Sequence, residues 1–334
     1  MFKILWSNMI KIVQLKLLKI KYSGDSIGRD IRIELGVLGK FFRFNQRIKA
    51  GAIAEINREV GRFETDRGLF QADVLITVVE RDLLFNDIGS TKGNIKVNTA
   101  IAKLQQFVFE AQVRETRSIF GKFWGTKIAA FEITLEAEVS DAIKYTPDVE
   151  EGRGKGWLKI ILEDDKSVKS LPAYLKLKIE RADAKREYFT ILEGPYRGRQ
   201  ASVELSDDDS LRLITGIKHE PPARITYSIS KKILTLKGKK YKADDDPKNP
   251  WKKGLYDIEI PDHPHRGGLN YPEAGRGTVW FRIGHSGERY LHPGMVSAGC
   301  ISVTETKRWM EIYDALIKAR KGDFMSIGIF EVID

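Results

Sequence analysis

The sequence is poor in the residues that build covalent and metal-based frameworks. It holds one cysteine, Cys300, and five histidines among 334 residues. A single thiol excludes a disulfide within the chain and a zinc site made of cysteines alone. It leaves the redox compartment open, because one free thiol is compatible with the cytosol and with the periplasm.

Long apolar runs are also missing. The N-terminal stretch MFKILWSNMIKIVQLKLLKIKYSG is apolar and basic, but lysines at positions 3, 11, 16, 19 and 21 interrupt it, and no small-residue cleavage site follows. We therefore expect neither a transmembrane helix nor a cleavable secretory signal here. The pattern from Ile12 to Tyr22 predicts a strand instead.

The charge is unbalanced and unevenly spread. The chain has 56 basic and 46 acidic residues, a net charge of +10, and residues 1–60 alone carry twelve basic and five acidic side chains. Such an excess favours anionic partners such as lipid head groups or wall polymers, although a solvated surface explains it equally well. No zinc-finger or aromatic-basic motif is present, so we expect no nucleic acid partner.

Runs of β-branched and alternating residues dominate the first 140 positions. They are IVQLKLLKIKY, DIRIELGVL, ADVLITVVERD, QQFVFEAQVRE and KIAAFEITLEAEV, separated by Gly, Asn and Asp clusters. This spacing predicts an antiparallel β-sandwich over residues 1–145. The polar segment YTPDVEEGRGKG follows and is typical of a linker.

The rest of the chain is also expected to be mainly β. Three apolar segments, WLKIILED, AYLKLKIER and REYFTILEG, lie within residues 146–220 and form either a small β module or the leading strands of the last domain. After a break at KHEPPAR, residues 221–334 form the final domain. There Ser302 and Glu305 have the spacing of a capping box, and a helix is predicted to follow over residues 309–317.

The thiol lies in a context suited to chemistry. A cysteine nucleophile needs a base, backbone donors for an oxyanion and an accessible turn. Gly299 allows the backbone to bend in SAGC, and a helix beginning shortly afterwards would lower the thiol pKa. His285, at the end of the predicted strand TVWFRIGH, is a candidate base. A buried, inert cysteine is the alternative.

His285, Gly294 and SAGCI at 297–301 resemble the signature of L,D-transpeptidases of the YkuD type, in which a histidine precedes Ser-x-Gly-Cys by some fifteen positions. The region ITYSISKKILTLKGKKY and the segment PWKKGLYDIEIPD resemble the same family's opening hairpin and strand. The resemblance covers about residues 222–334. It implies a β fold with a helix after the catalytic cysteine.

The resemblance also implies a mechanism, and no cofactor. Cys300 would attack the carbonyl before the terminal D-Ala of a peptidoglycan stem tetrapeptide, with His285 as base and the N–H groups of Gly299 and Cys300 as the oxyanion hole. An amine then completes transpeptidation or D-amino-acid exchange, and water completes L,D-carboxypeptidation. His292 is the rival base, and Ser297, Tyr271 and Arg282 are candidate substrate contacts.

The sequence departs from the family pattern in three places. Ala298 stands where the family often has His or Lys, Ser302 where it commonly has Arg or Asn, and Ser286 separates the histidine from glycine. These departures suggest a divergent branch, such as the transpeptidase-type effectors that bacteria inject into rivals. The expected place of action is the bacterial periplasm or cell envelope, reached through a dedicated secretion system.

Two further groups of residues have ligand chemistry. His263 and His265, with Asp262 nearby, have a spacing too sparse to predict a metal. The N-terminal segments resemble calcium/phospholipid-binding β-sandwiches of the protein kinase C type, with acidic loops at SGDSIGRD and VVERDLLFND. Asp25, Asp30, Asp82 and Asp87, with Glu80 and Asn86, are the calcium candidates, and the basic N-terminal region is a candidate surface for anionic membrane.

Two alternatives remain open at this point. One is a non-enzymatic wall- or membrane-binding protein whose transpeptidase-like domain has lost activity. The other is a cysteine peptidase or amidase that acts on a different peptide with the same residues.

Overall fold

A computed structural model describes residues 10–81, 86–101, 103–119, 122–150, 155–206, 212–295 and 298–334, with the side chains of residues 116–126 outside this description. The chain divides into two compact units after Ala142. Among the described residues, no helix is both long enough and apolar enough to cross a bilayer.

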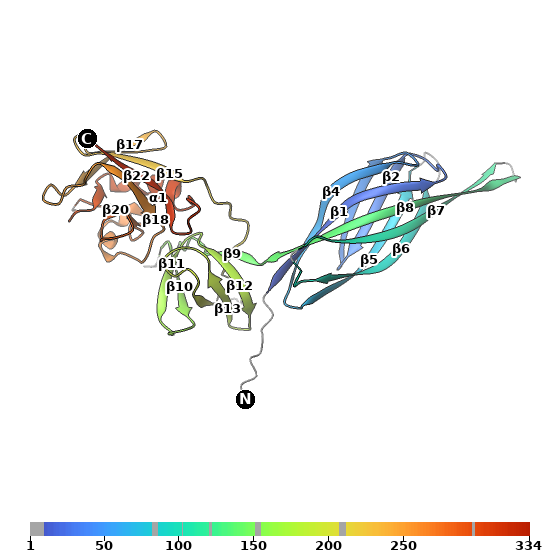
Figure 1. The fold of residues 1–334 in the computed structure, drawn as a ribbon, viewed down its shortest axis with the longest axis horizontal. Helices are drawn as coiled ribbons and strands as arrows, with labels where there is room; N and C mark the ends of the chain where they lie inside the picture. The colour runs from blue at the N-terminus through green and yellow to red at the C-terminus, as the bar shows by residue number, and fades with distance from the viewer. Residues whose placement is uncertain are drawn as a thin grey trace, which may run out of the picture. The chain divides into compact units, whose positions relative to one another are not determined.

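The first unit is a sandwich of two four-stranded antiparallel sheets (Figure 1). One sheet has the order β4-β1-β8-β7, with the strands β1 (Lys11–Gly24), β4 (Ile53–Thr65), β7 (Gln105–Ile119) and β8 (Lys122–Asp141). The other has the order β3-β2-β5-β6, with the strands β2 (Asp30–Val37), β3 (Lys40–Arg47), β5 (Leu69–Glu80) and β6 (Asp87–Asn98).

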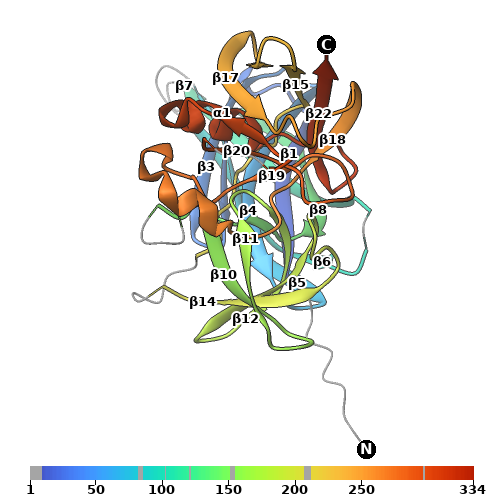
Figure 2. The same ribbon diagram turned by 90° about the vertical axis from the view of Figure 1, so that its left-hand side faces the viewer.

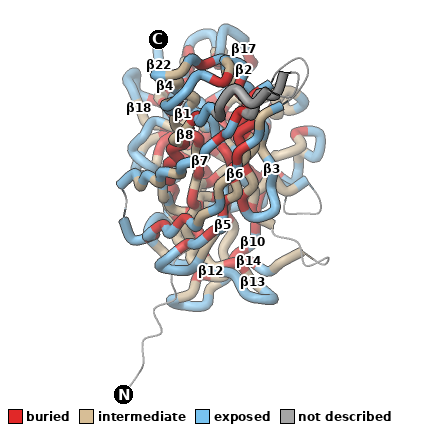
Figure 3. Tube along the Cα trace, turned by 90° about the vertical axis from the view of Figure 1, so that its right-hand side faces the viewer, coloured by how far each residue is buried: buried red, intermediate tan, exposed pale blue. Residues whose placement is uncertain are grey.

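Strand β1 shows how the sequence builds this core. Val13, Leu15 and Leu17 are fully buried, as a two-residue period requires. The register with both neighbouring strands then shifts between Leu17 and Lys19, and the buried positions become Ile20 and Tyr22. The bulge thus keeps the apolar face turned inward although two leucines are adjacent in the sequence. Figure 3 shows the resulting buried interior in red.

The second unit begins with a six-stranded antiparallel sheet of the order β11-β10-β14-β13-β12-β9. Its strands are β9 (Ile143–Tyr145), β10 (Trp157–Leu162), β11 (Val168–Pro172), β12 (Lys176–Ala182), β13 (Arg186–Ile191) and β14 (Gln200–Glu204). The start of the expected linker is built into this sheet. Thr146 is fully buried, and its hydroxyl donates to the carbonyl of Pro172 at 2.5 Å and accepts from the N–H of Leu175 at 2.9 Å.

The remainder of the second unit is an eight-stranded mixed sheet of the order β18-β22-β15-β16-β17-β21-β20-β19 (Figure 2). Its strands are β15 (Ala223–Ser228), β16 (Ile233–Leu236), β17 (Lys239–Asp245), β18 (Gly254–Glu259), β19 (Phe281–Arg282), β20 (Tyr290–Pro293), β21 (Ile301–Val303) and β22 (Ser326–Ile333). The helical segments are η2 (Arg266–Asn270), η3 (Pro272–Ala274), η4 (Thr306–Arg308) and α1 (Trp309–Leu316). Two pairs are parallel, β15 with β22 and β20 with β21.

Largely buried ion pairs join the two sheets of the second unit. Arg276 contacts Asp148 at 2.8 Å, and Arg320 contacts Glu193 at 2.9 Å. Arg320 also donates to the carbonyl of Tyr174 at 3.1 Å. The six-stranded sheet therefore supports the sheet that carries Cys300.

The structure confirms the mainly β, multi-sheet architecture, the strand over residues 12–22 and a helix after Cys300. The prediction of a capping box formed by Ser302 and Glu305 was wrong. Ser302 lies in β21, and the Glu305 carboxylate accepts the backbone N–H of Lys242 at 2.7 Å instead of closing the helix start. A strand and a 3₁₀ turn separate the cysteine from α1. The residues with the capping-box spacing therefore belong to the sheet or bond to it.

Candidate active site

Cys300 lies immediately before β21, next to the start of the neighbouring strand β20. Backbone groups of the preceding loop and strand contact its side chain: the thiol sulfur accepts the N–H of Tyr290 at 3.4 Å, and the thiol lies 3.8 Å from the carbonyl oxygen of Glu288. The residue is 9% exposed. Cys300 thus lies just beneath the surface and is not deep in the core.

The turn before the cysteine requires glycine. Gly299 has φ +102°, and a Cβ there would lie 2.4 Å from the Nδ2 atom of Asn249. Asn249 is held in turn by the guanidinium of Arg289, which lies over the Trp251 ring at 4.8 Å from its centroid. This confirms that Gly299 allows the backbone to bend; the oxyanion role of Gly299 and Cys300 stays a prediction.

The thiol is not activated in the way its sequence context indicated. Burial raises the pKa of Cys300, and the Tyr290 N–H and the Arg289 charge lower it only in part. The expected helix start does not follow directly, because α1 begins at Trp309. A resting thiol of this kind needs a neighbouring base to become a nucleophile.

His285 is held by two carboxylates. Its Nε2 atom lies 2.7 Å from Asp257 and its Nδ1 atom 2.7 Å from Glu259, and the side chain is 57% exposed. The hydrogen bond to Asp257 is the main cause that raises the pKa of His285. Burial raises the pKa of Glu259, which the hydrogen bond from His285 opposes. Since ionised carboxylates only accept, this arrangement favours a protonated imidazolium, which cannot take a thiol proton.

His292 has the opposite environment. It is buried in β20, its Nδ1 atom lies 3.0 Å from the carbonyl oxygen of Pro293, and its Nε2 atom lies 3.2 Å from the hydroxyl of Ser302. A carbonyl only accepts, so Nδ1 carries the proton and Nε2 is left as an acceptor. Burial lowers the pKa of His292, which favours the neutral ring.

The register of the parallel strands places His292 beside Ser302, two residues after the cysteine. His292 pairs with Ser302, and Leu291 pairs with Ile301. Cys300 precedes β21, and its sulfur accepts the backbone N–H of Tyr290, two residues before His292 in β20. Diagonal neighbours on a sheet lie about 7–8 Å apart between Cα atoms, within reach of long side chains.

Aromatic rings cover this face. The Trp280 ring stacks on His292 with 4.2 Å between centroids and on His265 with 4.3 Å. Tyr290 donates its hydroxyl to Asp262 at 3.0 Å, and Arg282 reaches the same carboxylate oxygen at 2.9 Å. Arg282 is therefore held by an acidic partner, and its expected role as a substrate contact stays a prediction.

Two further predicted substrate contacts are Tyr271, which contacts the segment before the cysteine, and Ser297. The hydroxyl of Tyr271 accepts the N–H of Met295 at 3.0 Å, and its ring packs where a Cβ at Gly294 would lie 3.0 Å away. Tyr271 thus shapes this loop. Ser297 lies outside the described residues.

Sequence reasoning missed Trp280, Tyr290 and Asn249 as neighbours of the site. The available signal was the pair of short apolar segments YLHP and ISV, which places His292 and Ser302 on matching positions of two strands, with Tyr290 and Cys300 two residues before them. No local pattern points to Asn249, because its contact with Gly299 joins segments fifty residues apart.

The calcium candidates of the first unit are engaged by the protein where they are described. Asp25 accepts the N–H of Ile128 at 2.9 Å, and Asp30 lies 3.7 Å from Arg47. Asp82 lies outside the described residues. In the described part of the chain, the one cluster with three metal-ligand atoms within 4.8 Å of one another is Asp262, His263 and His265, so Asp25, Asp30 and Asp87 form no such group there.

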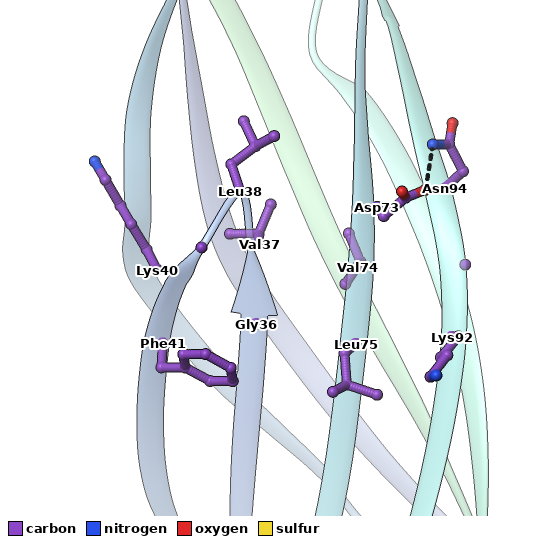
Figure 4. Close-up of a pocket in the computed structure, with 12 residues that line it drawn as sticks. Gly36, Val37, Leu38, Lys40, Phe41, Asp73, Val74, Leu75, Lys92 and Asn94 are labelled. Atoms are coloured by element: carbon purple, nitrogen blue, oxygen red, sulfur yellow. Dashed lines mark hydrogen bonds between the residues drawn. The ribbon is translucent and has the colours of Figure 1, made fainter.

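The first unit carries an open hollow of about 790 Å³ beside the β2–β3 turn (Figure 4). Leu38 and Phe41 line it and are 50% and 78% exposed. The side chains of Lys40 and Lys92 lie at its margins (Figure 4). This combination places apolar and cationic groups together on one surface.

No family model matches the chain, and no curated protein matches it. Among solved structures, it is similar to a C2 domain of plant extended synaptotagmin 1, with 13% identity over 37% of this chain and 93% of that domain and a TM-score of 0.22. It is also similar to human GIVD cytosolic phospholipase A2, with 11% identity over 59% of this chain and 30% of that chain and a TM-score of 0.25. These values are too low to establish a shared fold.

Proposed function

We propose that the second unit catalyses acyl transfer through Cys300, with His292 as the general base. The observation that supports this most is the environment of His292: its Nδ1 proton points to the carbonyl of Pro293, burial lowers its pKa, and Nε2, which contacts the Ser302 hydroxyl two residues after Cys300, is the acceptor of the ring. A nucleophile, a base and a group that orients the base are the parts such catalysis needs. Here the carbonyl of Pro293 orients the base.

The proposed reaction has two balanced steps. The Cys300 thiol gives its proton to Nε2 of His292, the sulfur forms a bond to the substrate carbonyl carbon, and the C–N bond breaks as the amine leaves with that proton. An amine or water then attacks the thioester, its proton passes through His292, and the thiol is restored. Covalent catalysis of this kind divides one hard step at an unreactive amide into two easier ones.

The substrate class rests on the resemblance of His285, Gly294 and SAGCI to L,D-transpeptidases. It is a peptidoglycan stem tetrapeptide, and the place of action is the bacterial envelope. In this proposal the base moves from His285 to His292, because both nitrogens of His285 contact carboxylates. An amidase acting on another peptide would use the same residues, and substrate identity separates the two.

The test is to incubate the full chain with purified muropeptides beside Cys300→Ala and to analyse the products by mass spectrometry. Loss of D-Ala, a 3-3 cross-link or D-amino-acid exchange, absent in Cys300→Ala, supports the proposal and names the acceptor. Products that form equally in the variant would refute a cysteine mechanism. Silence on stem peptides, with cleavage of other acyl-peptides that depends on Cys300, would favour the amidase. If neither the wild-type protein nor Cys300→Ala forms a product from any substrate, the non-enzymatic alternative remains.

We also propose that the first unit docks on anionic membrane through the hollow beside the β2–β3 turn. Exposed Leu38 and Phe41 would enter the head-group boundary, and Lys40 and Lys92 would face anionic lipids. The excess of seven positive charges in residues 1–60 acts in the same direction.

Sedimentation with vesicles of phosphatidylserine and phosphatidylcholine tests this docking. Phe41→Ala should reduce binding, whereas Leu255→Ala, which removes a leucine of the second unit that is 70% exposed, should not. Equal binding by both variants would refute the site. Repeating the assay with calcium and with a chelator shows whether Asp25, Asp30, Asp82 and Asp87 take part.

A further inference from the structure

Three side chains with metal-ligand chemistry converge after β18. Asp262, His263 and His265 follow the buried end of this strand, and His265 immediately precedes η2. One ligand atom from each lies within 4.8 Å of the other two. The cluster supplies no nucleophile or base to the acyl transfer described above.

Two of the three distances between the ligand atoms are close to those around a shared ion. The Oδ1 atom of Asp262 lies 3.2 Å from Nδ1 of His263 and 3.2 Å from Nε2 of His265. Ligands bound at 2.0–2.1 Å to a tetrahedral zinc ion are separated by about 3.3 Å. The two imidazole nitrogens lie within 4.8 Å of each other, so a turn of the exposed His263 ring would place all three atoms around one ion.

The supporting contacts fix two of the ligands. The other carboxylate oxygen of Asp262 accepts from Arg282 at 2.9 Å and from Tyr290 at 3.0 Å, and Oδ1 accepts the backbone N–H of His263 at 2.8 Å, which leaves its second lone pair for an ion. The ring of His265 is stacked on Trp280 with an angle of 4° between planes. Hydrogen bonds and packing behind metal ligands are the usual means of holding them in place.

The third ligand leaves the site open to solvent. The side chain of His263 is 55% exposed, whereas those of Asp262 and His265 are about one-tenth exposed. Two imidazoles and one carboxylate are a donor set that suits zinc, with a further position for water. The turn that presents them is tight, since a Cβ at Gly268 would lie 1.9 Å from the carbonyl oxygen of Gly277.

We propose that Asp262, His263 and His265 bind one divalent transition-metal ion of the zinc type. The ion is held by Oδ1 of Asp262, Nδ1 of His263 and Nε2 of His265, with its remaining position facing solvent. Because Trp280 stacks on both His265 and His292, the ion lies one aromatic ring away from the proposed base. The site would therefore couple metal occupancy to the environment of Trp280 and His292.

Titration calorimetry of the chelator-treated full chain with zinc chloride tests the proposal. We expect one ion per chain and a loss of affinity of at least about tenfold in His263→Ala, because even removal of a group behind a ligand costs that much. His263 is exposed, so this variant should fold. Asp262→Asn is the second variant, and its circular dichroism spectrum reports whether it folds.

His285→Ala is the matched control. His285 is as exposed as His263 and also contacts carboxylates, but its two nitrogens contact two different ones, Asp257 and Glu259, and cannot bind one ion together. Zinc binding should survive in this variant. The proposal is overturned if the wild-type protein binds no zinc, if His263→Ala binds it equally well, or if His285→Ala loses it. Cobalt absorption provides a second measure of tetrahedral binding that does not depend on activity.

Discussion

His285 and His292 lie in the same segment of the chain and differ in nearly every physical respect. His285 is exposed, clamped by Asp257 and Glu259, and its pKa is raised. His292 is buried, bonded to a carbonyl and a hydroxyl, and its pKa is lowered. The comparison teaches that the spacing of a motif can point to a candidate histidine. The hydrogen-bond donors and acceptors around that histidine determine whether it is protonated and on which nitrogen.

The largest expected effect separates the two histidines by activity. His292→Ala should lower kcat/KM on a Cys300-dependent substrate by about 10²–10⁴, the usual contribution of a positioned base, because the thiol proton then has no acceptor. His285→Ala should cost less than about tenfold. Steady-state assays of both variants, with melting curves as a folding control, make the measurement. A large loss in His285→Ala with full activity in His292→Ala would reverse the comparison.

A second expected effect concerns the turn that precedes the thiol. Gly299→Ala introduces a Cβ at φ +102° and 2.4 Å from Asn249 Nδ2, so we expect a loss of about 1–3 kcal/mol in the free energy of unfolding. Gly287→Ala is the matched control on the His285 side. Its φ is also positive, +82°, but the space around it is open, so it should be the milder change. Chemical denaturation compares them, and equal losses would show that the contact with Asn249 is unimportant.

The smallest expected effect is a pH dependence of opposite sign for the two histidines. The raised pKa of His285 adds stability that is present below its ordinary pKa of about 6.5 and is lost as the pH rises through its folded value. The lowered pKa of His292 does the reverse: stability is present above about 6.5 and is lost as the pH falls through its folded value.

Denaturation at several pH values tests both signs. Relative to wild type, His285→Gln should be less stable at acid pH by about 1 kcal/mol or less, since an exposed pair is screened by solvent, and equally stable at alkaline pH. For His292→Gln, the loss in the free energy of unfolding relative to wild type should become smaller as the pH falls. Deficits with the same pH trend in both variants would contradict the assigned environments.

The sequence was sufficient for those features that depend on local periodicity. The strands β1, β2, β5, β7 and β8 of the first unit, the strands β15–β17 and the helix after Cys300 follow from alternation and helical spacing, whereas β3, β4 and β6 were not predicted. It was insufficient where contacts join distant segments. Thr146 lay in a polar, glycine-rich stretch typical of linkers, yet its hydroxyl closes the six-stranded sheet.

The site shows the same limit. The positions of Cys300 and Gly299 could be predicted from SAGC, whose glycine has the expected positive φ. The partners of His285 could not, because Asp257 and Glu259 precede it by more than twenty residues and reach it only through the folded sheet. Arg282 and Tyr290 likewise hold the Asp262 carboxylate by hydrogen bonds. They follow it by about twenty residues or more, so no local pattern predicts these contacts.

The most direct measurement is a pH titration of the histidine ring nitrogens by long-range ¹H–¹⁵N NMR on the full chain, assigned with His285→Gln and His292→Gln. The structure predicts that His292 stays neutral at a pH of about 6.5, the ordinary histidine pKa, with its proton on Nδ1, while His285 is still protonated there. A neutral His285 beside a protonated His292, or a His292 with its proton on Nε2, would contradict the assignment of His292 as the base.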